Sequence, residues 1–120
     1  MTSSIRSHAD ALRAEMTRVL VLNAQPGSAA DSGTDQFVAG FVDLAIHASE
    51  GNTKPRDEYL SVIVPSVRAS GISLAESIAG MVGLGMGGAV VLEGEQRAWW
   101  YRFCADYSAR MATLWEASVP

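Results

Sequence analysis

The segment from Gly80 to Leu92, GMVGLGMGGAVVL, holds five glycines in thirteen residues and no charged side chain. Inside a helix each glycine costs about 0.5–1 kcal/mol relative to alanine. Five of them amount to several kcal/mol, against a domain stability of roughly 5–15 kcal/mol. A helix here therefore needs a compensating contact that uses its lack of side chains.

The same glycines spell GxGxxG at Gly83, Gly85 and Gly88, the pattern of a dinucleotide-binding loop. That loop requires a strand before the first glycine and a helix that begins at the third. Here the preceding residues are predicted to be helical, and only four apolar residues follow Gly88 before the charges begin. No Lys-Ser or Lys-Thr follows, as a Walker-type loop requires. The pattern therefore does not favour nucleotide binding.

A membrane span is also disfavoured, because it needs about 20 apolar residues. The longest segment without a charged residue runs from Ser77 to Leu92. It has sixteen residues and is bounded by Glu76 and Glu93. This length is typical of a buried helix in a globular core.

Close packing of a neighbour against the helix is the favoured interpretation. Three of the glycines recur at i, i+3 and i+7 and form one smooth stripe: Gly80, Gly83 and Gly87. Gly85 and Gly88 widen this stripe, and Met81 and Met86 beside it are adaptable fillers. The contact is predicted to be a crossing helix, with a flat ligand or a hinge as the alternatives.

Apolar residues at helical spacing predict about five helices in one domain, residues 1–120. The expected ranges are 5–24, 32–50, 54–70, 74–92 and 95–117. Whether the last two are separate or nearly continuous depends on Gly94 and stays open. The predicted fold is all-α, globin-like or a helical bundle.

Two capping boxes mark helix starts, one at Ser32 and Asp35 and the other at Ser73 and Glu76. The sequence SVIVP, which ends at Pro65, is compatible with a short strand or with a kinked helix. The helix is favoured because every neighbouring segment is helical.

Charge and cysteine content narrow the classes of function. The net charge is −4 without a basic run, which disfavours nucleic-acid binding. Cys104 is the only cysteine, so an internal disulfide and a zinc site of several thiolates are excluded. It lies on an apolar stripe and is expected to be an inert buried side chain. The N-terminus has no apolar signal segment, which predicts a cytoplasmic protein.

No catalytic or metal-binding constellation is visible. His8 and His47 belong to no cluster with metal-ligand spacing, and a structural or surface role is favoured for both. No paired carboxylates and no nucleophile with a base in reach are found. We therefore expect no enzyme activity, no resident cofactor and no metal, with haem ligation by a histidine as the alternative.

The sequence AWWYRF concentrates four aromatic residues, and Trp99 cannot share the inner face with Trp100. An exposed aromatic side chain favours a dimer interface, although Trp99 could instead cover the first helix of its own chain. The predicted interface residues are Trp99, Arg102, Asp106, Arg110 and Trp115.

Residues 56–116 resemble the second half of the non-haem globin-like sensor domains at the N-terminus of RsbR-type stressosome proteins. The resemblance rests on the helix ending VRASGISLAES, the apolar helix after it, and the final helix WWYRFCADYSARMATLW. It implies a globin-like fold without haem, dimerised through terminal helices, that receives a signal. Those domains usually precede an output domain, whereas this sequence ends at Pro120.

These observations together predict a regulatory or sensory binding module that acts through dimerisation and helix repacking, possibly with a signalling partner protein. The alternative is a carrier for a small tetrapyrrole-like molecule. Its ligand-contact candidates are Gly80, Gly83, Gly87, Met81, Met86 and His47.

Overall fold

The computed structural model describes residues 5–22 and 32–118, without the side chains of residues 21–22 and 32–35. This part of the chain forms a short 3-10 helix and five α-helices and contains no strand. The elements in order are η1 (Ile5–His8), α1 (Ala9–Leu22), α2 (Ser32–Ser49), α3 (Lys54–Ala69), α4 (Leu74–Ala89) and α5 (Gly94–Ala117). The predicted all-α helical bundle is confirmed.

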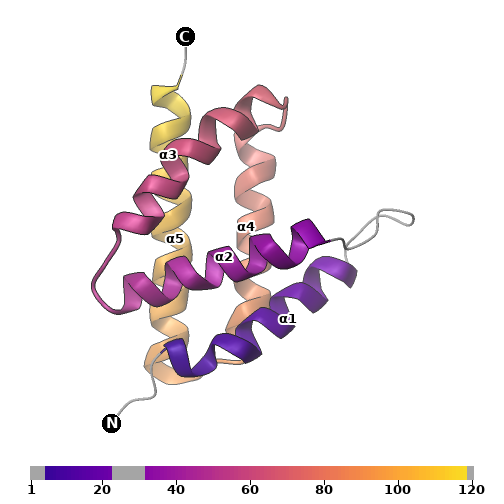
Figure 1. The fold of residues 1–120 in the computed structure, drawn as a ribbon, viewed down its shortest axis with the longest axis vertical. Helices are drawn as coiled ribbons and strands as arrows, with labels where there is room; N and C mark the ends of the chain where they lie inside the picture. Colours follow the sequence, from indigo (N-terminus) through magenta and orange to yellow (C-terminus); the bar gives the residue numbers. More distant parts are fainter. Residues whose placement is uncertain (1–4, 23–31, 119–120) are drawn as a thin grey trace.

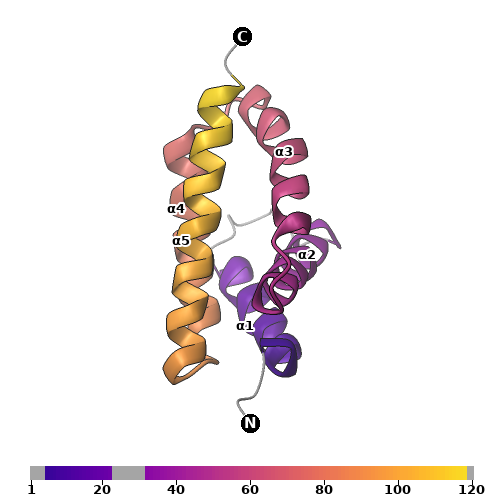
Figure 2. The same ribbon diagram turned by 90° about the vertical axis from the view of Figure 1, so that its left-hand side faces the viewer.

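The helices form two layers (Figures 1 and 2). One layer is the antiparallel pair of α4 and α5. The other holds α1, α2 and α3, with α1 packed on α4 and α3 packed on α5. Figure 2 shows that all three of these helices lie on the same side of the pair. No described helix therefore covers the opposite side of α4 and α5.

Several predicted helix boundaries are confirmed. The Glu76 backbone N–H donates to Ser73 Oγ at 3.1 Å, which makes Ser73 the N-cap of α4. The helix interpretation of SVIVP is also confirmed, since α3 runs through Pro65. The capping box at Ser32 and Asp35 falls where side chains are not described.

The open question at Gly94 is answered, because α4 and α5 are separate helices joined by a tight turn. Gly94 has φ +56°, a left-handed conformation that L side chains rarely adopt. The Arg97 Nε atom donates to the Ala89 carbonyl oxygen at 3.1 Å, across the turn. The same carbonyl accepts from the Leu92 backbone N–H at 3.0 Å, and Arg97 adds a cation, the charge favoured at the end of a helix.

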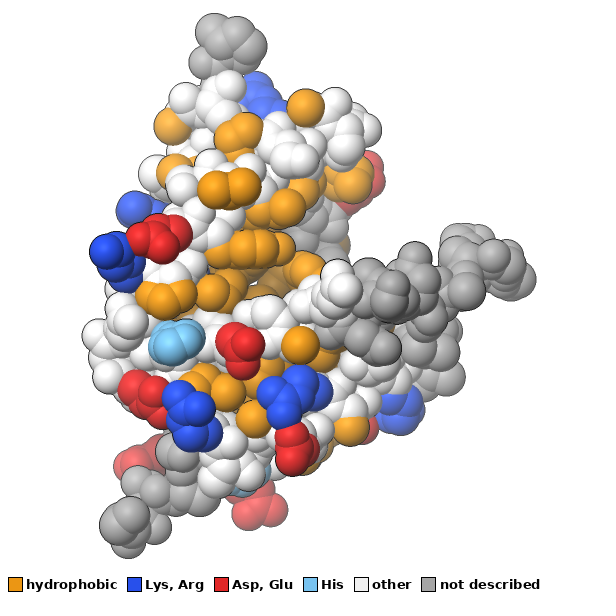
Figure 3. All heavy atoms as spheres, in the orientation of Figure 1, with side chains coloured by type: hydrophobic (Ala, Val, Ile, Leu, Met, Phe, Trp, Pro, Cys, Tyr) orange, Lys and Arg blue, Asp and Glu red, His pale blue; other side chains and the backbone are white. Residues whose placement is uncertain are grey.

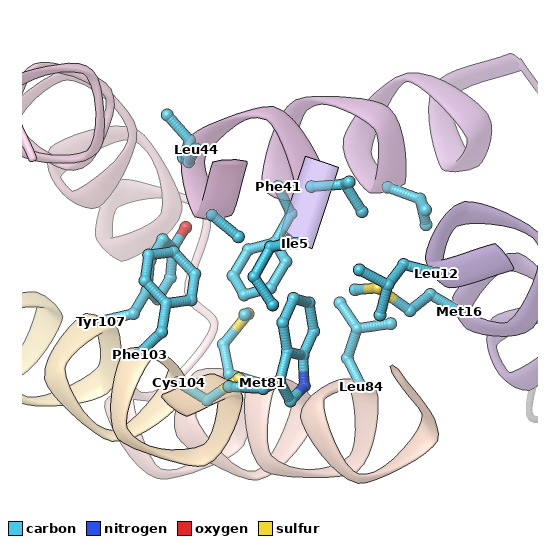
Figure 4. Close-up of a cluster of buried hydrophobic side chains, with 14 of the residues drawn as sticks. Ile5, Leu12, Met16, Phe41, Leu44, Met81, Leu84, Phe103, Cys104 and Tyr107 are labelled. Atoms are coloured by element: carbon cyan, nitrogen blue, oxygen red, sulfur yellow. The ribbon is translucent and has the colours of Figure 1, made fainter. Parts of the chain in front are cut away.

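The centre of the core is an aromatic cluster between α2 and α5 (Figure 4). Phe41 of α2 meets three rings of α5 edge-on, at centroid distances of 5.8 Å for Trp100, 5.5 Å for Phe103 and 5.1 Å for Tyr107. All four side chains are buried. Edge-to-face pairs at such distances stabilise a core beyond the area that they bury.

The close packing predicted for the glycine helix is confirmed at three of the five glycines. A Cβ atom on Gly88 would lie 2.8 Å from Cζ2 of Trp100, and one on Gly87 would lie 2.7 Å from Cγ2 of Val19. A Cβ atom on Gly85 would lie 2.9 Å from the sulfur of Cys104. These distances are too short for a real side chain, so α1 and α5 approach α4 where it has none.

The prediction was wrong for the other two glycines. A Cβ atom on Gly80 or Gly83 would have no neighbouring atom within 4 Å, so no crossing helix requires glycine there. The buried side of α4 carries Gly85 and Gly88, and Gly87 meets α1 beside it. The stripe of three glycines thus does not lie along a single contact.

This difference predicts opposite effects of alanine on stability. Gly80→Ala is expected to stabilise the protein by about 0.5–1 kcal/mol, because it lowers the entropy of the unfolded chain and meets no neighbour. Gly88→Ala is expected to destabilise it by about 1–3 kcal/mol, because Trp100 is fully buried and cannot move aside. Urea unfolding monitored by tryptophan fluorescence measures both. Equal stability of the two variants would contradict the close packing at Gly88.

Candidate functional site

A cavity of about 320 Å³ opens between α2 and α3, with α4 and α5 as its floor. In Figure 3 it is the hollow between these two helices, and hydrophobic side chains surround it. Its described lining residues come from all five α-helices and the α3–α4 turn. They are Leu20, Phe37, Tyr59, Ile63, Val64, Val67, Ile72, Glu76, Ser77, Gly80, Met81, Leu84, Tyr107, Met111 and Trp115.

Two of the described α4 residues in the lining contribute little side-chain volume to the cavity wall. Ser77 and Gly80 line it from α4, one with a short side chain and the other with none. On the α3 side the walls are larger apolar residues such as Ile63 and Val67. The space left between these surfaces is open to solvent on one side.

Polar groups in the lining are few. Glu76 is exposed, Ser77 is half-buried, and the remaining oxygens belong to the hydroxyls of Tyr59 and Tyr107. Burial raises the pKa of both tyrosines, and in Tyr107 the neighbouring Tyr59 adds to the effect. Both hydroxyls therefore stay neutral near pH 7. Lys, Arg and His are absent from the described lining, so it offers no counter-charge for an anion.

The structure separates the predicted ligand-contact residues of α4. Gly80 and Met81 line the cavity. Gly83 and Met86 are exposed, and Met86 lies on the opposite side of α4, beside Tyr101. Gly87 lies against α1.

The histidines do not lie at the cavity. His47 is exposed near the end of α2, and His8 is half-buried in η1, where its Nδ1 atom is 3.3 Å from Ser7 Oγ. Within the described residues, no group of three or more His, Cys, Asp or Glu is placed to hold a metal ion.

The two tryptophans predicted at a dimer interface pack within the chain. Trp99 is half-buried, and its ring stacks on Phe103 at 5.4 Å with an interplanar angle of 13°. Trp115 is half-buried and lines the cavity. Its backbone carbonyl accepts a hydrogen bond from Arg68 of α3, which ties the end of α5 to α3.

The three predicted charged interface residues of α5 have different surroundings. Arg110 reaches α3, where its Nε atom lies 3.7 Å from Asp57 Oδ1. Arg102 and Asp106 are exposed.

An apolar surface on the uncovered side of α4 and α5 was not predicted. We call it the outer face and define it by its large side chains, whose exposed fractions are 51% for Val82, 60% for Met86, 62% for Val90 and 47% for Tyr101. A hollow of about 360 Å³ lies in it between α4 and α5. The uncharged run from Ser77 to Leu92 was the signal for this surface, because a helix without charges leaves apolar residues on every side.

Cys104 is a buried free thiol, as its place on an apolar stripe predicts. It is buried below Gly85, and burial raises the pKa of its thiol to about 12. The thiolate, which is the reactive form, is therefore scarce near neutral pH.

Comparison of the chain with protein-family models, with curated proteins and with solved structures finds no match. Among the described helices, none combines the length and the apolar character that crossing a membrane requires.

Burial of Cys104 predicts a loss of stability at alkaline pH. An unfolded thiol titrates near pH ~8.5, so between that pH and about 12 the unfolded chain has lost a proton that the folded chain keeps. The free energy of unfolding therefore falls as the pH rises through this window, by about 1 kcal/mol between roughly pH 7.5 and 9.5. Urea unfolding of the wild type and of Cys104→Ala at both pH values measures it. The variant has no thiol, so its free energy of unfolding should fall less than that of the wild type between the two pH values. An equal pH dependence of the two proteins would contradict the prediction.

Proposed function

We propose that the protein is a regulatory binding module whose cavity takes a small, uncharged, apolar molecule. The observation that carries the proposal is the cavity of about 320 Å³ with an almost entirely apolar lining. Ligand sites typically have volumes of roughly 300–1,000 Å³, and an apolar cavity of about 150 Å³ already holds benzene. This cavity has room for a molecule about the size of two fused or linked aromatic rings.

The lining favours a neutral ligand over an anionic one. No cationic side chain from the described lining would stabilise a carboxylate or phosphate, and Glu76 at the cavity would repel it. The Tyr59 and Tyr107 hydroxyls can donate to a carbonyl or ether oxygen of the ligand. With no described histidine in the lining, these features support an uncharged ligand better than a histidine-bound tetrapyrrole.

The proposed regulation acts through a change in helix packing when the ligand binds. The cavity is enclosed by α3 on one side and by α4 and α5 on the other, and Glu76, Ser77 and Gly80 of α4 border it. A ligand that fills the space favours the helix positions that fit it best, and this shifts the population of the protein towards them. The module would thus act as a cytoplasmic signal-input domain, the role that the resemblance to stressosome sensor domains implies.

A fluorescence titration with prodan, an uncharged dye with two fused aromatic rings and a carbonyl group, tests the proposal, because its emission shifts to shorter wavelength in apolar surroundings. The wild type is expected to bind one dye per chain with a saturable signal. Ile63→Trp fills the cavity from α3 and should weaken binding at least about tenfold, or about 1.4 kcal/mol. Val62→Trp is the matched control, because Val62 is the adjacent residue, is 74% exposed, and is not part of the lining.

The outer face is a second place where an apolar dye can bind, and Val82→Glu distinguishes it from the cavity. Binding that survives Val82→Glu and is lost in Ile63→Trp supports the proposal. Binding that follows the opposite pattern, or a wild type without saturable binding, contradicts it.

A further inference from the structure

The outer face lacks the polar side chains of a solvated helix surface. From Ser77 to the end of α4, each of the exposed residues is glycine or apolar: Ala79, Gly80, Val82, Gly83 and Met86. Val90 at the C-cap continues the series. The solvent side of an amphipathic helix normally carries charged or polar residues, and monomers rarely expose wide contiguous apolar patches.

The neighbouring part of α5 makes this face flat. Its outward positions carry mostly small residues: Ala98, Ala105, Ser108, Ala109 and Ala112. Tyr101 is the large exception, and together with Ala105 and Ser108 it borders the hollow beside Val82 and Met86. Small residues allow another helix to approach the backbone closely, and the hollow can take a protruding apolar side chain.

Two charges at the edge of the face are arranged symmetrically. Arg102 and Glu116 are exposed on α5, seven residues before and seven residues after Ala109, and thus about 21 Å apart along the helix. Neither makes an ion pair or a side-chain hydrogen bond with any other described residue. Consider a two-fold axis that passes next to Ala109, lies in the plane of the outer face and is perpendicular to α5. This axis places Arg102 of each copy opposite Glu116 of the other.

The alternative two-fold arrangement, with its axis parallel to the helices, is disfavoured by charge. Figure 1 shows that the start of α4 and the end of α5 lie at the same end of the antiparallel pair. That arrangement puts α4 of one copy against α5 of the other. Gly85 lies beside Trp100 and Cys104, so Arg102 would face the uncharged part of α4, between Ser77 and Leu92, in the second copy. A charge left unpaired at an interface costs binding energy. Of these two arrangements, only the first therefore places an opposite charge at Arg102.

We propose that the outer face is the interface of a homodimer, in which α4 and α5 of one chain pack antiparallel on α4 and α5 of a second copy and Arg102 pairs reciprocally with Glu116. An interface of this kind is isologous, the same patch facing itself. It retains Arg102 from the predicted interface and replaces Trp99 with Val82 and Met86 as the apolar contacts. The inference stands independently of any ligand in the cavity.

The first test is the mass of the ligand-free protein, measured by sedimentation equilibrium between about 1 and 100 µM, a range in which weak specific dimers form. The wild type is expected to be a dimer at the upper end. Val82→Glu should raise the dimer dissociation constant more than about tenfold, because two carboxylates would be buried unpaired. Val62→Glu is the matched control, an exposed valine on α3 outside the outer face, and should leave the constant unchanged.

The orientation is tested by charge exchange on α5. Arg102→Glu and Glu116→Arg should each weaken the dimer, and the double variant Arg102→Glu/Glu116→Arg should restore it, because the pairs re-form with opposite signs. Far-UV circular dichroism and urea unfolding establish that each variant is folded.

Three results would overturn the inference. They are a monomeric wild type at about 100 µM, a dimer unaffected by Val82→Glu, and a double variant no tighter than the single ones. Loss of dye binding with an intact dimer would overturn the proposed ligand site and leave this interface standing, so the two failures are distinguishable.

Discussion

The indole of Trp100 is fully buried against α4, where its Nε1 atom donates to the Gly85 carbonyl oxygen at 2.8 Å. The ring fits there because neither Gly85 nor Gly88 has a side chain. This contact sets how closely α5 approaches α4. Phe41 packs edge-on against the same indole, so the position of α2 depends on it in turn. The cost of these glycines in helix stability is offset by the packing around one tryptophan.

The helix α4 takes part in two different surfaces. Ser77 and Gly80 border the apolar cavity, whereas Val82 and Met86 belong to the outer face on its other side. A shift of α4 towards or away from a ligand would therefore move the outer face as well. Because packed interfaces change between discrete arrangements rather than deforming smoothly, a small displacement of α4 is sufficient to alter dimer affinity. Ligand binding and dimerisation, both proposals, would then be coupled through one rigid element.

The sequence predicts where the helices lie along the chain, but it does not predict which side of α4 is buried. Periodicity and caps located α3, α4 and α5, including the start at Ser73, because these signals are local. The side of α4 that faces inward was not predictable, since the helix is apolar all round and periodicity cannot orient such a helix. Gly80 and Gly83 were therefore assigned to a helix crossing that uses Gly85, Gly87 and Gly88. The cavity depends on how α3 packs against α5 beside α4, which follows from tertiary packing alone.

The two remaining glycines still require an explanation, because no neighbour in the described chain excludes a side chain at Gly80 or Gly83. Alanine at either position would favour the helix by about 0.5–1 kcal/mol. A side chain at Gly80, however, would reduce the cavity, and one at Gly83 would stand on the exposed side of α4 beside Val82. Positions where a protein keeps a locally unfavourable residue without a packing reason are often functional ones. On this argument the proposed ligand site would account for Gly80, and the proposed dimer for Gly83.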